Sequence, residues 1–130
     1  MIYGIGTDIV SVARLQEMLT RFGDKLPGRI LGAQEQLDFA NLHTDEAHQA
    51  RFLAKRFATK EAFAKALGTG LRAPILMPAI DTTHDALGKP VLQYGDELAT
   101  FMQTHRLHAH LSVSDEAEYV VAFVMVEQSA

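Results

Sequence analysis

The long uninterrupted helical segment in the middle of the chain constrains the fold more than any other feature. Residues 45–67 read DEAHQARFLAKRFATKEAFAKAL, contain no proline or glycine, and are rich in residues of high helix propensity. Two glycines in the GTG sequence that follows, Gly68 and Gly70, end the pattern. We therefore expect one long central helix, with the rest of the chain packed around it.

This helix places cations where an apolar face is expected. At 100° per residue, Phe52 and Phe63 fall on one apolar arc. Arg56 and Lys60 project into the same arc, and a buried cation must be paired, or must face a cleft or an anion. Residues 51–65 hold five cations and one acid, a local charge of +4 in a chain whose total is −4. The pattern suits a polyanion such as a nucleotide or a phosphate ester; a solvated helix with extended lysine side chains is the alternative.

A carboxylate near the end of the first predicted strand is the second anomaly. Residues 2–10, IYGIGTDIV, read as a short buried strand that contains Asp8. Glu61 lies at the edge of the apolar arc of the long helix, among the cations. If the two carboxylates converge, they suit Mg²⁺, which takes one or two carboxylates together with water and substrate phosphates. In the alternative, Asp8 is a capping or turn residue, and Glu61 forms a surface pair with Lys65 that contributes roughly 0.3–0.5 kcal/mol.

The remaining segments are predicted to be helices and strands. A helix begins after Ser11, which can cap it, and ends at Gly23. Further along we expect a loop or short helical turn at 26–32, a short helix at 34–42, strands at 75–83 and 91–94, a helix at 96–105, and strands at 108–114 and 119–127. The last strand is almost continuously apolar and is expected to be buried on both faces. These elements predict the α+β class, with a largely antiparallel sheet and a long central helix in a single domain spanning residues 1–130.

Composition excludes several classes of protein. The chain has 130 residues, of which 48% are hydrophobic and 22% charged, as in ordinary globular domains. It has no cysteine, which excludes disulfides, thiolate metal sites and a cysteine nucleophile. The net charge of −4 argues against a general nucleic-acid binder. Because we find neither a secretory signal nor an apolar run long enough to span a bilayer, we expect a cytoplasmic protein with no membrane partner.

Other candidate sites have less support in the sequence. His108 and His110 lie two residues apart on a predicted strand and so face the same side, but no third ligand is near them in sequence. Ser112 and Ser114 lack the G-x-S-x-G context of a nucleophile elbow. The sequence contains no P-loop and no dinucleotide-binding fingerprint.

Four blocks of sequence together resemble the holo-acyl-carrier-protein synthases, the small phosphopantetheinyl transferases of bacteria. They are GIGTDIVSVARL, FLAKRFATKEAFAKALGTG, GKP and HLSVSDEAEYVVAFVMVE, in that order over nearly the whole chain. The resemblance implies an enzyme that transfers the 4′-phosphopantetheine arm of coenzyme A to a serine hydroxyl of apo-acyl-carrier protein. The other product would be adenosine 3′,5′-bisphosphate. It also implies a Mg²⁺ cofactor and a homotrimer with the active site between neighbouring subunits.

The resemblance further assigns roles to particular residues around the reacting phosphate. Asp8, in the G-x-D motif, and Glu61, in the K-E-A motif, match the family's magnesium ligands. Lys65 matches a lysine beside the reacting phosphate, and Arg56 and Lys60 match cations around the phosphates of the coenzyme. The proton of the attacking serine would pass to a metal-bound water held by Glu61 or, alternatively, to a neutral Lys65, so Glu61 and Lys65 are the candidate catalytic residues.

Two further groups of residues are assigned by the same resemblance. Residues in the GKP loop match the loop near the nucleotide, and basic residues on the first helix match the face that meets the acidic carrier protein. These are Gly88, Lys89 and Pro90 in the loop, and Arg14 and Arg21 on the helix.

One position departs from the family pattern, and one rival function stays open. Asp115 stands where many relatives have histidine, so a phosphate contact or proton role at this position is in doubt. An oligomeric nucleotide-binding regulator without transferase chemistry would need the cluster of cations but would not need the pair of carboxylates formed by Asp8 and Glu61.

Overall fold

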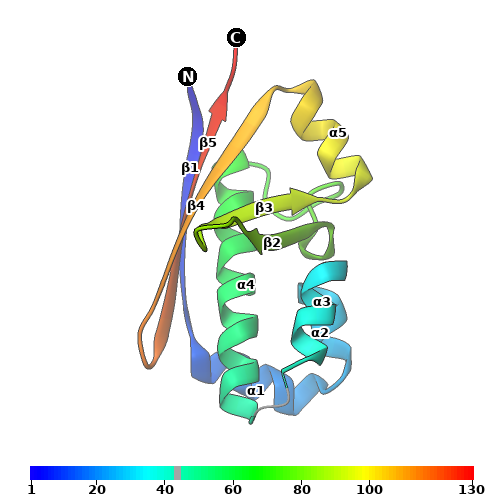
Figure 1. Ribbon diagram of the computed structural model, residues 1–130, viewed down its shortest axis with the longest axis vertical. Coiled ribbons are helices and arrows are strands. Elements are labelled where there is room, and N and C mark those ends of the chain that lie inside the picture. The colour runs from blue at the N-terminus through cyan, green and yellow to red at the C-terminus, as the bar shows by residue number, and fades with distance from the viewer. Residues whose placement is uncertain (43–44) are drawn as a thin grey trace.

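The computed structural model describes residues 1–42 and 45–130, and its centre is the long helix α4 (Glu46–Leu67) packed against a sheet (Figure 1). The Asp45 carboxylate caps the helix N-terminus by accepting from the backbone N–H of His48 at 3.0 Å. Gly68 ends it in the left-handed conformation, with φ of 79°. The central helix predicted over residues 45–67 is confirmed.

Three antiparallel strands form the sheet that covers one side of α4. The order is β1 (Ile2–Ser11), β5 (Tyr119–Gln128) and β4 (Leu107–Asp115), so the first and last strands of the chain lie side by side (Figure 1). A second, two-stranded antiparallel sheet contains β2 (Ile80–His84) and β3 (Pro90–Tyr94). Together with the helices, these sheets confirm the predicted α+β class.

Two glycines in β1 set the distance between the sheet and α4. A Cβ atom added at Gly4 would collide with the carbonyl oxygen of Ala66, and one added at Gly6 would collide with that of Ala62. Alternate residues of a strand face the same side, so Asp8 also faces α4. The close approach that these glycines permit therefore brings the Asp8 carboxylate next to the helix.

Smaller helices pack around α4 and the two sheets. They are α1 (Val12–Phe22), α2 (Lys25–Ile30), α3 (Ala33–Ala40) and α5 (Asp96–Thr104), with a 3₁₀ turn at Met77–Ala79. Ser11 caps α1 by accepting from the Arg14 N–H at 3.1 Å, as predicted. None of the helices in residues 1–42 and 45–130 is both long enough and apolar enough to cross a membrane.

One prediction of secondary structure is corrected, and another is narrowed to one of its alternatives. The strand expected at 75–83 begins only at Ile80, because Pro78 lies in the 3₁₀ turn that precedes it. Residues 26–32, for which a loop or short helical turn was expected, contain most of the short helix α2, which agrees with the second alternative.

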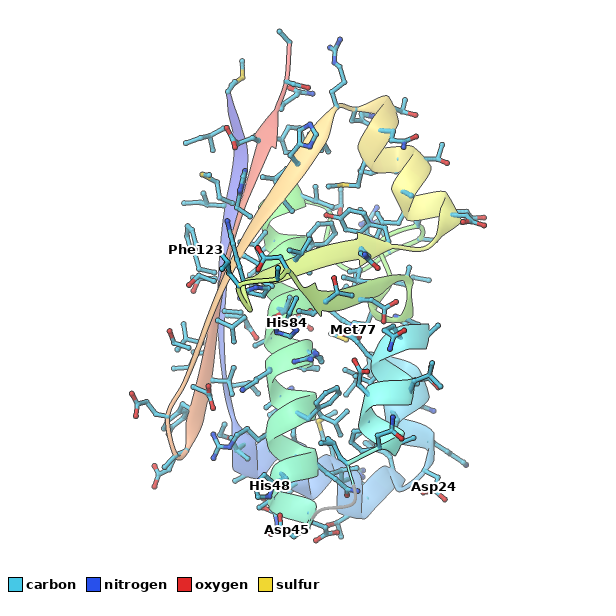
Figure 2. All side chains as sticks on the ribbon, viewed as in Figure 1. Asp24, Asp45, His48, Met77, His84 and Phe123 are labelled. Atoms are coloured by element: carbon cyan, nitrogen blue, oxygen red, sulfur yellow. The ribbon has the colours of Figure 1, made fainter. Side chains whose placement is uncertain are left out.

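The prediction that the last strand is buried on both faces is wrong for the single chain. In β5, Val120 and Val124 are fully buried against α4, whereas Val121 and Phe123 on the opposite face are 39% and 43% exposed. Phe123 points away from the helices in Figure 2. The outer face of β5 is therefore apolar but uncovered.

Candidate active site

A carboxylate and an ammonium meet where β1 crosses α4. The Lys65 Nζ lies 3.2 Å from Asp8 Oδ1 and donates to the backbone carbonyl of Thr7 at 3.0 Å. The Asp8 side chain is 17% exposed and that of Lys65 is 54% exposed. Lys65 therefore pairs with Asp8 across the two elements instead of forming the helical surface pair with Glu61. The site is open to solvent on the Lys65 side.

Glu61 lies one helical turn before Lys65 and has an altered acidity. Partial burial raises the pKa of the Glu61 carboxyl, and the negative charge of Asp8 raises it further. Lys65 and Arg14 oppose this shift without cancelling it. The structure thus brings Asp8, Glu61 and Lys65 together, as the resemblance implied.

The donor set at this site fits a hard divalent cation. In residues 1–42 and 45–130 we find no group of three or more histidine, cysteine or acidic side chains that could hold a metal. A site of two carboxylates suits Mg²⁺, which usually completes its shell with water and substrate phosphates. Repulsion between Glu61 and Asp8 is the interaction that a cation between them would relieve.

Lys60 does not belong to this open site. Its side chain is completely buried, and its Nζ donates to Glu35 Oε1 and to the carbonyl of Ile30, both at 2.5 Å. Burial lowers the pKa of the Lys60 ammonium, and the Glu35 carboxylate opposes that shift. The expectation that Lys60 lies among the cations around the coenzyme phosphates is therefore corrected. Its ammonium is buried and is paired with the Glu35 carboxylate.

Glu35, on α3, is the partner of Lys60 and Arg56, and the sequence analysis did not identify it. Its buried carboxylate accepts from the backbone N–H groups of Gly32 at 3.0 Å and Thr82 at 2.9 Å, in addition to Lys60. Its Oε2 also lies 3.2 Å from Arg56 Nε. The two cations in the apolar stripe of α4 indicated that a buried anion must lie nearby. Nothing in the sequence of α3 indicated that Glu35 is that anion.

Arg56 connects this buried cluster to a groove. Its Nε is buried without a hydrogen-bond partner among the described residues, because the approach of Glu35 is an ion pair and not a well-directed hydrogen bond. Its guanidinium lies over the ring of Phe52, 4.3 Å from the ring centroid. Because Arg56 also lines the groove, its positive charge is available to an anionic ligand bound there.

The groove beside Arg56 has a volume of about 440 Å³ and runs along α4. Among its lining residues are three cations of α4 and two residues of the GKP loop, namely Arg51, Lys55, Arg56, Gly88 and Pro90. In Figure 2, His48 marks the N-terminal end of α4, and His84 marks the end of β2 that lies farther along the helix. Both histidines line the groove.

The GKP loop is held in a fixed turn. The Asp85 Oδ1 accepts from the backbone N–H groups of Leu87 and Lys89, both at 2.9 Å. Gly88 takes a φ of 85°, which favours glycine. The turn presents Gly88 and Pro90 to the groove, and the Lys89 side chain is not among the groups that line it.

Arg14 and Arg21 lie on α1, outside the groove. Both side chains are exposed, and seven residues separate them, which places them on one side of the helix. The Arg14 guanidinium lies 5.4 Å from the centroid of the Phe57 ring of α4. Because Arg14 also influences the Glu61 carboxyl electrostatically, this basic face lies next to the site formed by Asp8, Glu61 and Lys65.

The fold agrees with what comparison with known proteins shows. Residues 4–124 match the family model described as the 4′-phosphopantetheinyl transferase superfamily. The chain belongs to this superfamily of transferases. Its relatives place it among the holo-acyl-carrier-protein synthases of that superfamily, so the predicted enzyme class is confirmed.

The similarity extends over the full length of the chain. A holo-[acyl-carrier-protein] synthase of Dechloromonas aromatica is 56% identical over 129 residues, covering 99% of this chain and 100% of that protein. The crystal structure of holo-[acyl-carrier-protein] synthase from Neisseria meningitidis superimposes with a TM-score of 0.91 at 46% identity, covering 98% of this chain and 100% of that one. A Bacillus anthracis synthase solved in complex with CoA (3′,5′-ADP) has a TM-score of 0.81 at 35% identity, with 99% of each chain covered.

Proposed function

We propose that this enzyme transfers the 4′-phosphopantetheine group of coenzyme A to a serine of an apo-acyl-carrier protein and releases adenosine 3′,5′-bisphosphate. The observation that carries the proposal is the meeting of Asp8, Glu61 and Lys65 where β1 crosses α4. A separate feature of the same helix is the groove lined by Arg51, Lys55 and Arg56. The synthase names of full-length relatives support the proposal, as does the coenzyme in the Bacillus anthracis complex. A polyanionic substrate suits this groove because the cations partly neutralise its phosphates.

The proposed cofactor is Mg²⁺, held by Asp8 and Glu61. When bound, it would neutralise charge on the diphosphate and favour departure of the leaving group. The paired carboxylates and the raised pKa of Glu61 support this assignment, because a second carboxylate raises the cost of ionising Glu61 unless a cation is present.

The side chains around the carboxylates would each contribute to phosphoryl transfer. Lys65 is arranged as a donor, since it already donates to Asp8 and to Thr7, and it can turn toward the phosphate oxygens where charge develops. Arg56 lines the groove and would bind a coenzyme phosphate there. Glu61 would take part in removing the serine proton through a water molecule, because its raised pKa makes it a better acceptor than an ordinary carboxylate.

The function is tested by incubating the purified chain with coenzyme A, Mg²⁺ and an apo-acyl-carrier protein, and measuring the mass of the carrier. Gain of one phosphopantetheine group by the carrier supports the transferase. Tight binding of coenzyme A with no change in the mass of the carrier would instead support a nucleotide-binding regulator.

The basic face of α1 is proposed to bind the carrier protein, which is acidic in this family. Reversing the charge in Arg14→Glu is expected to raise KM for the carrier roughly tenfold, because opposite surface charges steer association. The salt dependence of association should become weaker as well. The affinity for coenzyme A, measured by calorimetry, should stay nearly unchanged, and a fall in that affinity would place Arg14 in the coenzyme site instead.

We also propose a homotrimer with active sites between subunits, as the resemblance implied. The support is the uncovered apolar face of the β1–β5 pair, where Ile5 and Ile9 are each 61% exposed and lie beside the partly exposed Val121 and Phe123. Such a patch commonly marks an interface. Sedimentation is expected to show a trimer for the wild type and a smaller, poorly active species for Phe123→Asp. A fully active wild-type monomer would contradict this proposal.

A further inference from the structure

The helix α4 carries two kinds of cation. Lys60 and Arg56 are tied to the buried carboxylate of Glu35, at 2.5 Å and 3.2 Å. Arg51 and Lys55 lie on the rim of the groove, with side chains 31% and 35% exposed. Lys60 belongs to the protein interior, and Arg56 is held by Glu35 at the wall of the groove. Arg51 and Lys55 are not bound to Glu35 and can exchange one anion for another.

A single carboxylate, Asp115 at the end of β4, pairs with both rim cations. Its Oδ2 lies 3.4 Å from Arg51 Nη1, and its Oδ1 lies 3.5 Å from Lys55 Nζ. Well-formed bonds between an ammonium or guanidinium and a carboxylate measure about 2.7–2.9 Å. The contacts of Asp115 are longer than this, and its side chain is 33% exposed to solvent. Arg51 and Lys55 therefore bind the Asp115 carboxylate weakly.

Arg51 would keep its position without Asp115. Its Nη1 donates to the carbonyl of Glu116 at 2.6 Å, and its Nη2 donates to that of Ala117 at 2.9 Å. These bonds anchor the β4–β5 hairpin to α4 through backbone groups that a change at position 115 leaves intact. Removing the Asp115 charge would therefore leave the cation in place on the rim of the groove.

Asp115 and the rim cations line the same groove as Arg56, Gly88 and Pro90. A polyanion that binds in this groove faces the negative charge of Asp115, which is already paired with Arg51 and Lys55. Such a ligand must displace the Asp115 carboxylate or bind against its repulsion, and either course costs binding free energy.

We propose that Asp115 is an internal counterion that competes with phosphate groups of the nucleotide for Lys55 and Arg51. This inference rests on the proposed function, which supplies the nucleotide. By weakening the hold on phosphate, Asp115 lowers the affinity for coenzyme A and speeds release of adenosine 3′,5′-bisphosphate after transfer. An acid at position 115 thus acts as a residue that tunes affinity.

The test is calorimetric titration of wild-type and Asp115→Asn protein with coenzyme A and with adenosine 3′,5′-bisphosphate. Asparagine keeps the size of the side chain and removes its charge. Exposed and partly exposed ion pairs contribute modestly, so we expect Kd to fall about three- to tenfold for both ligands. The plot of log Kd against log salt concentration should become steeper, and product release should become slower.

Glu116→Gln is the matched control, because it removes the same charge from the neighbouring, exposed position of the hairpin. It should leave both affinities nearly unchanged. An equal gain in the control would overturn the proposal by showing that only net charge matters, and so would an unchanged or higher Kd for Asp115→Asn. If the wild type binds neither nucleotide, the proposed function fails as well; equal binding by wild type and variant defeats this inference alone.

Discussion

Glu61→Gln and Asp8→Asn are each expected to lower turnover at limiting Mg²⁺ by roughly 100-fold or more. Replacing a residue that only hydrogen-bonds to a metal ligand already lowers metal affinity or activity by about 10–100-fold, and a ligand itself should matter more. Both changes keep the approximate shape of the side chain and remove one ligand charge. Raising the Mg²⁺ concentration should restore part of the activity. Turnover measured by the mass gain of the carrier over a Mg²⁺ titration checks this expectation.

The same two variants should remain folded. A carboxyl whose pKa is raised by folding destabilises the native state above that pKa, and the cost disappears as the pH falls below the unfolded-state value. Since burial and Asp8 raise the pKa of Glu61, Glu61→Gln should not lower the metal-free Tm at neutral pH. Asp8→Asn loses only its pair with the half-exposed Lys65. If either variant lost activity only in proportion to lost folded protein, the residue would be structural.

Glu35→Gln is expected to cost about 3–5 kcal/mol of unfolding free energy, the loss typical of breaking a buried ion pair from one side. Lys60 is fully buried, so without the Glu35 carboxylate its ammonium would remain in the interior without the paired negative charge. Urea denaturation measures the change. Glu17→Gln on the exposed face of α1 is the control, and we expect an effect within about 0.5 kcal/mol.

A second variant tests the mechanism of that loss. Replacing both partners, as in Glu35→Gln with Lys60→Met, should recover part of the stability, because the fully buried ammonium is then absent. Arg56 still loses its pair with Glu35 in the double variant, so the recovery is incomplete. A double variant as unstable as the sum of the two single variants would show that the two side chains contribute independently, and not as a pair.

The elements that follow from local pattern were predictable from sequence. The α4 segment has strong helix formers throughout and glycine at its end, and Ser11 and Gly23 mark the limits of α1 by local hydrogen bonding. The strand beginning at 75 was misjudged because apolar, β-branched composition outweighed the effect of Pro78. Local chemistry thus predicted most boundaries, and a proline in an apolar run produced the error.

The relations that depend on long-range packing were less accessible. Family resemblance predicted that Asp8, Glu61 and Lys65 belong to one site. The physical cause of their meeting is the close approach of β1 to α4 that Gly4 and Gly6 permit. The partner of Lys60 could not be named, because Glu35 lies 25 residues earlier on a separate helix. A periodic pattern shows that a cation is buried but not which anion it meets.

The outer face of the sheet shows a similar limit. Continuous apolar sequence in β5 indicated burial on both faces, yet one face is uncovered in the single chain. An apolar sequence indicates that a surface is covered, but it does not show whether the same chain or a neighbouring subunit covers it. The trimer proposal accounts for both observations.

The most direct test of the account is Mg²⁺-titrated turnover of the double variant with Asp8→Asn and Glu61→Gln, beside both single variants and the wild type. If the two side chains serve one ion, they act as a unit. The double variant should then lose little more activity than the worse single variant and stay far below the wild type, while its Tm remains near normal. Full turnover by the double variant at low Mg²⁺ would contradict the account.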